Sequence, residues 1–156
     1  VHVGLRLDAW MIEENASRRE DGGLSLKPCT IKVLGQTALL EANVPLKLKL
    51  TMDVDVYANL EWVVQVEFRR LLAMQGRQLD PVGHEIWMPS ETQYNNLFVG
   101  KYVTMLVADF ESVLVSKALK APEKNRDLVA QYLSRGASPR FVAMAQRYNI
   151  DLEKFV

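Results

Sequence analysis

Residues 47–57 read KLKLTMDVDVY, and this stretch decides the predicted fold. Apolar and polar side chains alternate along it, which is typical of a β-strand with two unlike faces. Side chains two positions apart share a face of a strand, so we expect Asp53 and Asp55 side by side. Aspartate is unfavourable in strands. The pair therefore indicates either a divalent-cation site or a solvated face on which both carboxylates only aid solubility.

Composition predicts one compact domain with a real hydrophobic core, because the chain has 156 residues, of which 49% are hydrophobic. The formal net charge is zero, so bulk charge does not argue for nucleic acid or an anionic membrane as a partner; a local basic patch stays open. The single cysteine, Cys29, excludes an internal disulfide and favours a reducing compartment, the cytoplasm. We expect no membrane partner and no signal peptide, since the chain lacks both patterns.

The remaining periodicity predicts an α/β or α+β domain over residues 1–156: a small mixed sheet flanked by helices, with a C-terminal helical subregion from about residue 109. An alternative strand at 62–66 stays open because that stretch is β-branched. A turn is expected at 95–96 and another at 80–83. Helices are predicted at 5–20, 37–43, 60–75, 109–119, 125–134 and 138–148, and strands at 30–34, 47–57, 84–88 and 101–108.

Residues 30–43, TIKVLGQTALLEAN, predict a strand, a glycine turn and a short helix. Such a turn exposes backbone N–H groups that can bind phosphate oxygens. A plain connection, in which Gly35 only gives the backbone freedom to turn, explains the same pattern. Both interpretations stay open from this segment alone.

Residues 33–57, VLGQTALLEANVPLKLKLTMDVDVY, together resemble the nucleotidyltransferase fold of the DNA polymerase beta superfamily. The resemblance is to its small bacterial branch, the abortive-infection and toxin–antitoxin-type nucleotidyltransferases and their uncharacterised relatives. Gly35-Gln36 corresponds to the branch's Gly-Gly or Gly-Ser turn, and Lys49-x-Thr51-x-Asp53-x-Asp55 to its Arg-x-Thr-x-Asp-x-Asp. Lys117, followed by Arg126-Asp127, is similar to its helical lysine and Arg-Asp pair. The likeness covers about residues 30 to 134.

The resemblance implies transfer of a nucleotidyl group from a Mg²⁺-bound (or Mn²⁺-bound) nucleoside triphosphate to a hydroxyl group of RNA, protein or a small molecule. The catalytic carboxylates that it implies are Asp53 and Asp55, which would hold the metal ion, joined by a third carboxylate. We expect this third acid to be Glu85, with Asp127 as the alternative. The nucleotide-binding residues that the resemblance implies are Gly35, Gln36, Thr37, Lys49 and Lys117.

Gln36 and the lack of a clear third carboxylate support a different class of function, and Lys49 is a further departure from the family pattern. Gln36 is bulky where the family has a small residue, and Lys49 lacks the bidentate fork of arginine. The alternative is a catalytically degenerate protein that keeps the fold and binds a protein partner, as in a toxin–antitoxin-like pair. The two neighbouring aspartates favour catalysis, because adjacent carboxylates repel each other unless a cation lies between them.

Overall fold

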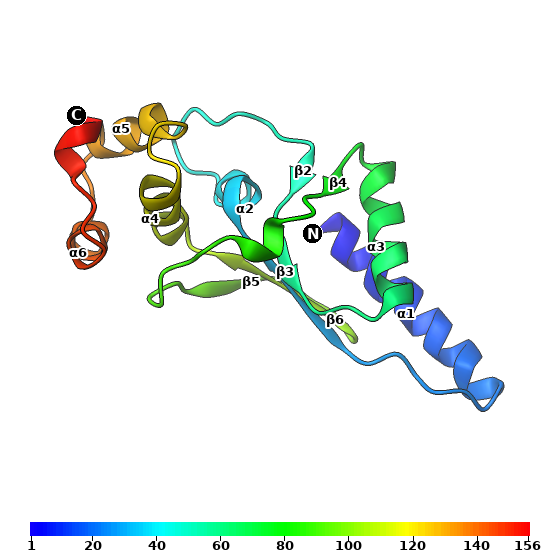
Figure 1. The fold of residues 1–156 in the computed structure, drawn as a ribbon. Helices are drawn as coiled ribbons and strands as arrows, with labels where there is room; N and C mark the ends of the chain where they lie inside the picture. Colours follow the sequence, from blue (N-terminus) through cyan, green and yellow to red (C-terminus); the bar gives the residue numbers. More distant parts are fainter.

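A computed structural model describes all 156 residues as a mixed α/β chain (Figure 1). None of its helices has the length and apolar composition that crossing a bilayer requires. The elements are α1 (His2–Glu20), β1 (Cys29–Val33), α2 (Gly35–Glu41), β2 (Asp53–Val54), β3 (Val56–Ala58), α3 (Trp62–Met74), β4 (Gln78–Leu79), η1 (Gly83–Glu85), β5 (Tyr94–Val99), β6 (Val103–Ala108), α4 (Phe110–Lys120), α5 (Arg126–Ser134), α6 (Pro139–Arg147) and η2 (Leu152–Phe155), where η marks a 3-10 turn.

The main sheet has the strand order β3-β1-β6-β5 and is mixed, as predicted. Strand β1 pairs parallel with β6 and antiparallel with β3, while β5 pairs antiparallel with β6. Ile31 and Val33 of β1 are buried, whereas Thr30 and Lys32, which alternate with them along the strand, are not. One face of the sheet therefore carries the core. A second, two-stranded sheet pairs β2 with β4 in parallel.

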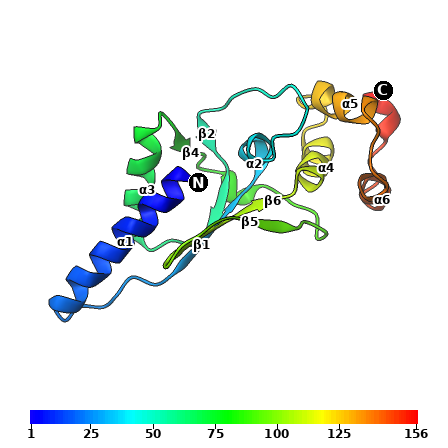
Figure 2. The ribbon, with the colours of Figure 1, turned by 180° about the vertical axis from the view of Figure 1, so that it is seen from behind.

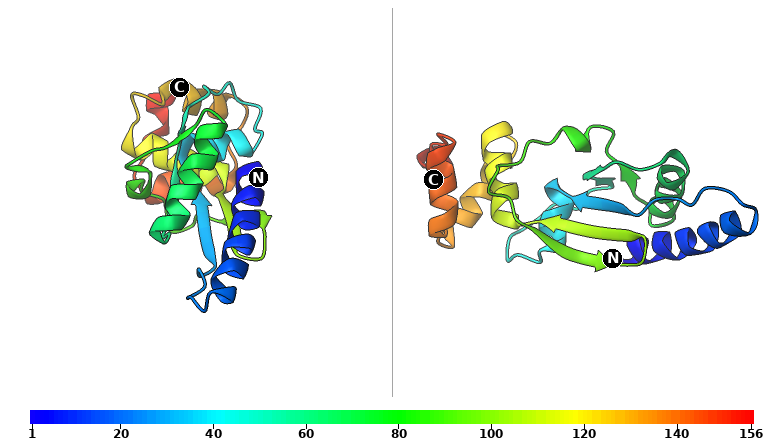
Figure 3. Two further views of the ribbon diagram at one scale, coloured as in Figure 1. Left: turned by 90° about the vertical axis from the view of Figure 1, so that its right-hand side faces the viewer. Right: turned by 90° about the horizontal axis from the view of Figure 1, so that it is seen from below.

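Helices lie at both ends of the sheet. Helices α1 and α3 pack together at one end, and α4, α5 and α6 gather at the other (Figures 1 and 2). Seen from below, the molecule is elongated, with the hairpin of β5 and β6 between the two helical groups (Figure 3). The segment between α2 and β2 arches over the top of the molecule toward α5 (Figure 1), where the Lys47 N–H donates to the Gln131 side chain at 2.9 Å.

Two buried polar side chains hold α1 on the body. The Asp8 carboxylate accepts backbone N–H groups of Lys101, Tyr102 and Val103 at 3.2, 2.6 and 3.0 Å, so it fills the turn between β5 and β6. Asn15 exchanges two hydrogen bonds with the backbone of Leu26, at 3.1 and 2.6 Å. These bonds satisfy polar groups that burial would otherwise leave without partners.

The helices predicted from periodicity are confirmed, and α3 excludes the alternative strand at 62–66. The single strand predicted at 47–57 is wrong: only β2 and β3 form, and Leu50 and Met52 are 88% and 66% exposed. No neighbouring strand pairs with 47–52, and alternation without a pairing partner does not make a strand. The strand predicted at 84–88 is also wrong, because η1 and irregular chain replace it. The turn expected at 95–96 lies within β5.

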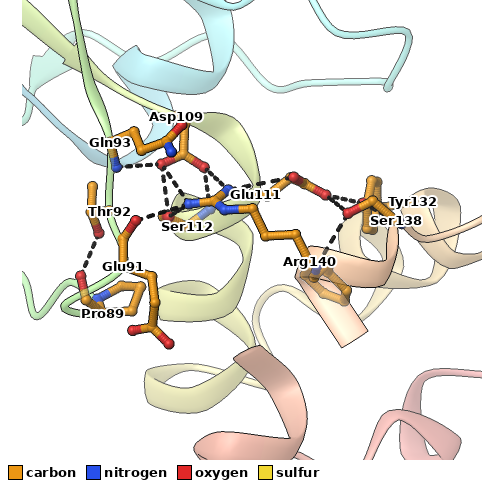
Figure 4. A network of polar contacts seen from close by, with 11 residues as sticks. Pro89, Glu91, Thr92, Gln93, Asp109, Glu111, Ser112, Tyr132, Ser138 and Arg140 are labelled. Atoms are coloured by element: carbon orange, nitrogen blue, oxygen red, sulfur yellow. Dashed lines mark hydrogen bonds and ion pairs between the residues drawn. The ribbon is translucent and has the colours of Figure 1, made fainter. Parts of the chain in front are cut away.

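A polar network joins the C-terminal helices to the sheet (Figure 4). Asp109 caps α4 by accepting the Ser112 N–H at 3.0 Å, as the sequence predicts. Arg140 of α6 donates to Asp109 at 2.6 Å, and its guanidinium also reaches Glu111 at 3.4 Å. Ser138 caps α6 and donates to Glu111. The start of α4 is therefore held by charge-assisted bonds from α6.

Replacing Arg140 with methionine should lower the free energy of unfolding by about 2–3 kcal/mol, because Asp109 and Glu111 would keep their charges and lose their cation. Arg147→Met is the matched control: its ion pair with Glu91 is at the surface, so its loss should cost less than about 1 kcal/mol. Urea unfolding of both variants measures this difference. Equal losses would show that the network does not hold α4.

Candidate active site

Asp55 lies directly against the glycine turn that follows β1. The Leu34 N–H donates to the Asp55 carbonyl oxygen at 2.8 Å, which extends the pairing of β1 and β3 up to the turn. Gly35 has a φ of +55°, and a Cβ built on it would overlap Oδ2 of Asp55. Glycine is therefore required both by the backbone conformation and by the carboxylate above it.

Asp80 is the second acid of the site, although its sequence context predicts only a turn residue. Strand β4 pairs in parallel with β2, with Val54 opposite Leu79, and the Asp80 N–H donates to the Val54 carbonyl at 3.0 Å. The next residues along both strands, Asp55 and Asp80, therefore come together. Gly83 then passes close to the Asp55 and Val56 backbone, which holds the 80–83 turn in place.

The Asp55 carboxyl holds its proton unusually tightly. Its pKa is raised from 3.8 to about 6, first by burial and then by interaction with the carboxyl group of Asp80. The backbone N–H of Gln36 and the charge of Lys117 act in the opposite direction and lower this pKa. No lysine, arginine or histidine forms an ion pair with either aspartate within 4.0 Å. The pair therefore needs a proton or a cation to relieve its repulsion.

Lys117 is the basic residue of this cluster. It lies half-buried on α4, and burial lowers the pKa of its ammonium group while the nearby Asp55 raises it and Lys124 lowers it. Its helix is tied to the segment before β5 by a hydrogen bond from the Ser116 hydroxyl to the Trp87 carbonyl at 2.5 Å. Lys117 therefore lies close enough to Asp55 for their charges to interact, and its predicted contact with the phosphates of a nucleotide stays a prediction.

The other predicted residues are placed in different ways. The Gln36 side chain donates to the Lys49 carbonyl oxygen at 2.8 Å, so it is directed toward the arching segment, and the Lys49 residue is exposed. Asp53 accepts a hydrogen bond from the Gln78 side chain at 2.7 Å. Asp53 lies two residues before Asp55 in the chain, and its carboxylate already has an amide partner.

Two predicted residues lie outside the cluster. The Glu85 side chain is 68% exposed in η1 and its nearest charged partner is His84 at 3.8 Å, so Asp80 takes the position next to Asp55 that we expected for Glu85. The alternative acid, Asp127, is exposed on α5. Thr37 is buried and is one of the residues around a cavity that neither Asp55 nor Asp80 borders. The signal that could have identified Asp80 is a carboxylate at the carboxyl end of a short strand, before Pro81.

The donor set fits Mg²⁺ only in part. No three carboxylate, histidine or cysteine side chains lie close enough together to form a complete metal site. Mg²⁺, however, is commonly bound by one or two carboxylates, with water and substrate phosphates filling the other positions. The contact between Asp55 and Asp80, which has no cationic side chain at ion-pair distance, matches that requirement.

Comparisons with models of protein families, with curated proteins and with solved structures give no match. The arguments for function therefore depend on the site itself.

Replacing Gly35 with alanine should destabilise the protein and displace Asp55. Gly76 is the matched control, because it has a φ of +69° and a Cβ added there would meet nothing within 4 Å. Gly76→Ala should cost about 1–2 kcal/mol, the cost of a left-handed residue. Gly35→Ala should cost at least about 1 kcal/mol more, since the added methyl overlaps a carboxylate. Chemical denaturation measures both, and equal costs would contradict the contact.

The Asp55 pKa predicts how stability changes with pH. Because the folded protein binds this proton more tightly than the unfolded chain does, the free energy of unfolding should fall as the pH rises from 3.8 through about 6. Asp55→Asn should reduce this fall and be more stable than the wild type above that range. Glu85→Gln, which alters an exposed side chain, should leave the profile unchanged. Urea unfolding across the pH range tests this, and identical slopes for Asp55→Asn and wild type would refute it.

Proposed function

We propose that this protein is a metal-dependent nucleotidyltransferase, with the nucleotidyltransferase fold that residues 33–57 resemble. The observation that carries the proposal is the contact between the carboxyl groups of Asp55 and Asp80, next to the turn at Gly35 and near Lys117. Paired carboxylates beside a basic residue are what a reaction on a metal-bound triphosphate requires.

In this proposal Asp55 and Asp80 hold the cation, and Asp53 joins them by releasing the Gln78 amide. Asp80 replaces Glu85 as the third carboxylate. Mg²⁺, when bound, neutralises the phosphate oxygens and the departing pyrophosphate. Lys117 supplies a second positive charge near the phosphates, and the backbone of Gly35 and Gln36 lines the turn on which the nucleotide would lie.

The reaction proposed is an in-line displacement at the α-phosphate. The acceptor hydroxyl oxygen forms a bond to the α-phosphorus, and the bond from that phosphorus to pyrophosphate breaks. The hydroxyl proton passes to water, because in this proposal Asp55 and Asp80 hold the cation, which takes the place of the proton that would otherwise relieve their repulsion. The acceptor is a hydroxyl group of RNA, protein or a small molecule.

A binding protein without catalysis is the second candidate. Two contacts favour it: the Gln36 side chain is bonded to Lys49, and Asp53 is bonded to Gln78, so both lie in hydrogen bonds that a nucleotide would have to displace. Such a protein would use its surface for a protein partner, as one half of a toxin–antitoxin-like pair. The two candidates differ in whether a metal–nucleotide complex binds.

Calorimetric titration with each nucleoside triphosphate, in the presence of Mg²⁺ or Mn²⁺, tests the proposal. We expect metal-dependent binding to the wild type and a loss of at least about tenfold in affinity in Asp55→Asn and Asp80→Asn, since each removes a charged ligand. Glu85→Gln is the matched control and should bind as the wild type does. Circular dichroism of each variant verifies that it is folded.

Binding that needs no metal, or that Glu85→Gln weakens as much as Asp80→Asn, would contradict the assignment of Asp80. Absence of binding for every nucleotide and both metals would exclude the enzyme and leave the second candidate. A search for a protein partner would then follow.

A further inference from the structure

A cavity borders the candidate active site on the side of α3. Its volume is about 140 Å³, and it lies between α3, β3 and the chain from β4 to η1, with Asp80 among the residues around it. Asp80 is one of the two interacting acids of the site, and its carboxylate accepts the Val82 N–H at 2.9 Å, which fixes the turn that carries it. The cavity therefore lies beside an acid that holds the cation in the proposed function.

The floor of the cavity is apolar and only partly covered by the protein. Phe68 of α3 is 1% exposed, while Val56, Ala58, Leu60 and Leu79 around it are half-buried. An apolar floor of this kind suits the hydrocarbon part of a ligand. An apolar cavity of about 150 Å³ accommodates benzene, so a ring of that size is the largest body that fits here.

Three polar side chains border the same cavity. Gln65 and Arg69 share a face of α3 with Phe68, because residues three and four apart lie on one side of a helix. Gln65 is half-buried and Arg69 is exposed. The third is His84, whose side chain is 59% exposed and whose only ionic partner is the neighbouring Glu85, at 3.8 Å. All three are therefore accessible to a molecule in the cavity.

Arg69 is the cation of this cavity and has no acid to balance it. The neighbouring Arg70 is paired with Glu67, whereas Arg69 makes no ion pair within 4.0 Å, with Asp80 or any other acid. A guanidinium group binds carboxylate and phosphate groups through parallel N–H donors. A free arginine beside an apolar floor therefore suits a ligand that carries an oxyanion.

We propose that this cavity binds the acceptor of the nucleotidyl group, and that the acceptor is a small hydroxy acid. Such a molecule has a hydroxyl group, a body no larger than a benzene ring, and a carboxylate or phosphate group. Arg69 binds the oxyanion, the body contacts Phe68 and Leu79, and the hydroxyl group lies toward Asp80. The inference rests on the proposed function, and it narrows the acceptor from RNA, protein or a small molecule to the last of these.

The transfer leaves Arg69 outside the reacting atoms. The acceptor's hydroxyl oxygen forms a bond to the α-phosphorus, and the bond from that phosphorus to pyrophosphate breaks, with its electron pair leaving on pyrophosphate. The hydroxyl proton passes to water, and the product is a phosphodiester of the hydroxy acid. Because Arg69 binds the acceptor equally before and during the transfer, its loss should raise the KM for the acceptor and spare kcat.

The hydroxybenzoates, benzoate and phenol are the matched probes. Benzoate lacks the hydroxyl group of 3- and 4-hydroxybenzoate, and phenol lacks their carboxylate. The methyl resonances of Val56, Leu60 and Leu79 in a ¹H–¹³C NMR titration without nucleotide report occupancy of the cavity. We expect the three acids to bind at least about tenfold more tightly than phenol, since only they pair with Arg69. Arg69→Gln should remove this preference, and Arg70→Gln, the matched control, should keep it.

Transfer is then measured by mass spectrometry with Mg²⁺ and the nucleotide that binds in calorimetry. We expect a hydroxybenzoate that carries the nucleotidyl group and no product from benzoate. Arg69→Gln should raise the KM for the hydroxybenzoate at least about tenfold and leave kcat unchanged, whereas Arg70→Gln should change neither. Phenyl phosphate in place of benzoate in the NMR titration shows which oxyanion Arg69 prefers.

The inference is overturned if the acids shift no methyl group of the cavity, or if Arg69→Gln keeps the preference for them over phenol. That titration contains no nucleotide, so its failure leaves the proposed function untouched. If a metal–nucleotide complex binds but neither hydroxybenzoate is modified, the acceptor role is wrong and the proposed function stands. If no metal–nucleotide complex binds, the proposed function and the acceptor role both fail.

Discussion

The close packing of the Asp55 carboxylate on Gly35 is the constraint on which the site depends. The carboxylate can occupy this place only because residue 35 has no side chain and a positive φ. The same contact brings the end of β1, the start of α2 and the start of β3 to one point, and the hydrogen bond from Leu34 to Asp55 fixes their spacing. Asp80 then reaches this point through the pairing of β4 with β2.

Repulsion between the two carboxylates of the site lowers the stability of the folded protein. The Asp55 and Asp80 carboxyl groups interact in a half-buried place, and Lys117 lies near them but not at ion-pair distance. The raised pKa of Asp55 reflects the unfavourable energy of ionising both acids there. A structure selected only for stability would place an arginine or an apolar side chain here. Perturbed carboxylates concentrate at functional sites for this reason, which is why the pair carries the argument for chemistry.

How much of the fold could be predicted depended on how local its signals are. The α6 start at Ser138-Pro139 and the α4 cap at Asp109 follow from neighbouring residues, and both were predicted. By contrast, the roles of Asp8 and Arg140 depend on partners that are distant in the sequence, and periodicity carries no sign of them. The error at residues 47–57 has the same origin, since alternation is local but strand formation needs a neighbour.

The sequence by itself determined the helices, the strands at the centre of the sheet, the glycine turn and the Asp-x-Asp pattern, because each is encoded within a few neighbouring residues. Only the tertiary structure decided which carboxylates meet. It brought Asp80 to Asp55, kept Asp53 with Gln78, left Glu85 in solvent and buried Thr37 beside a separate cavity. The physical reason is that these contacts follow from the pairing of β2 with β4 and from the packing of α2, which are long-range interactions that no local pattern specifies.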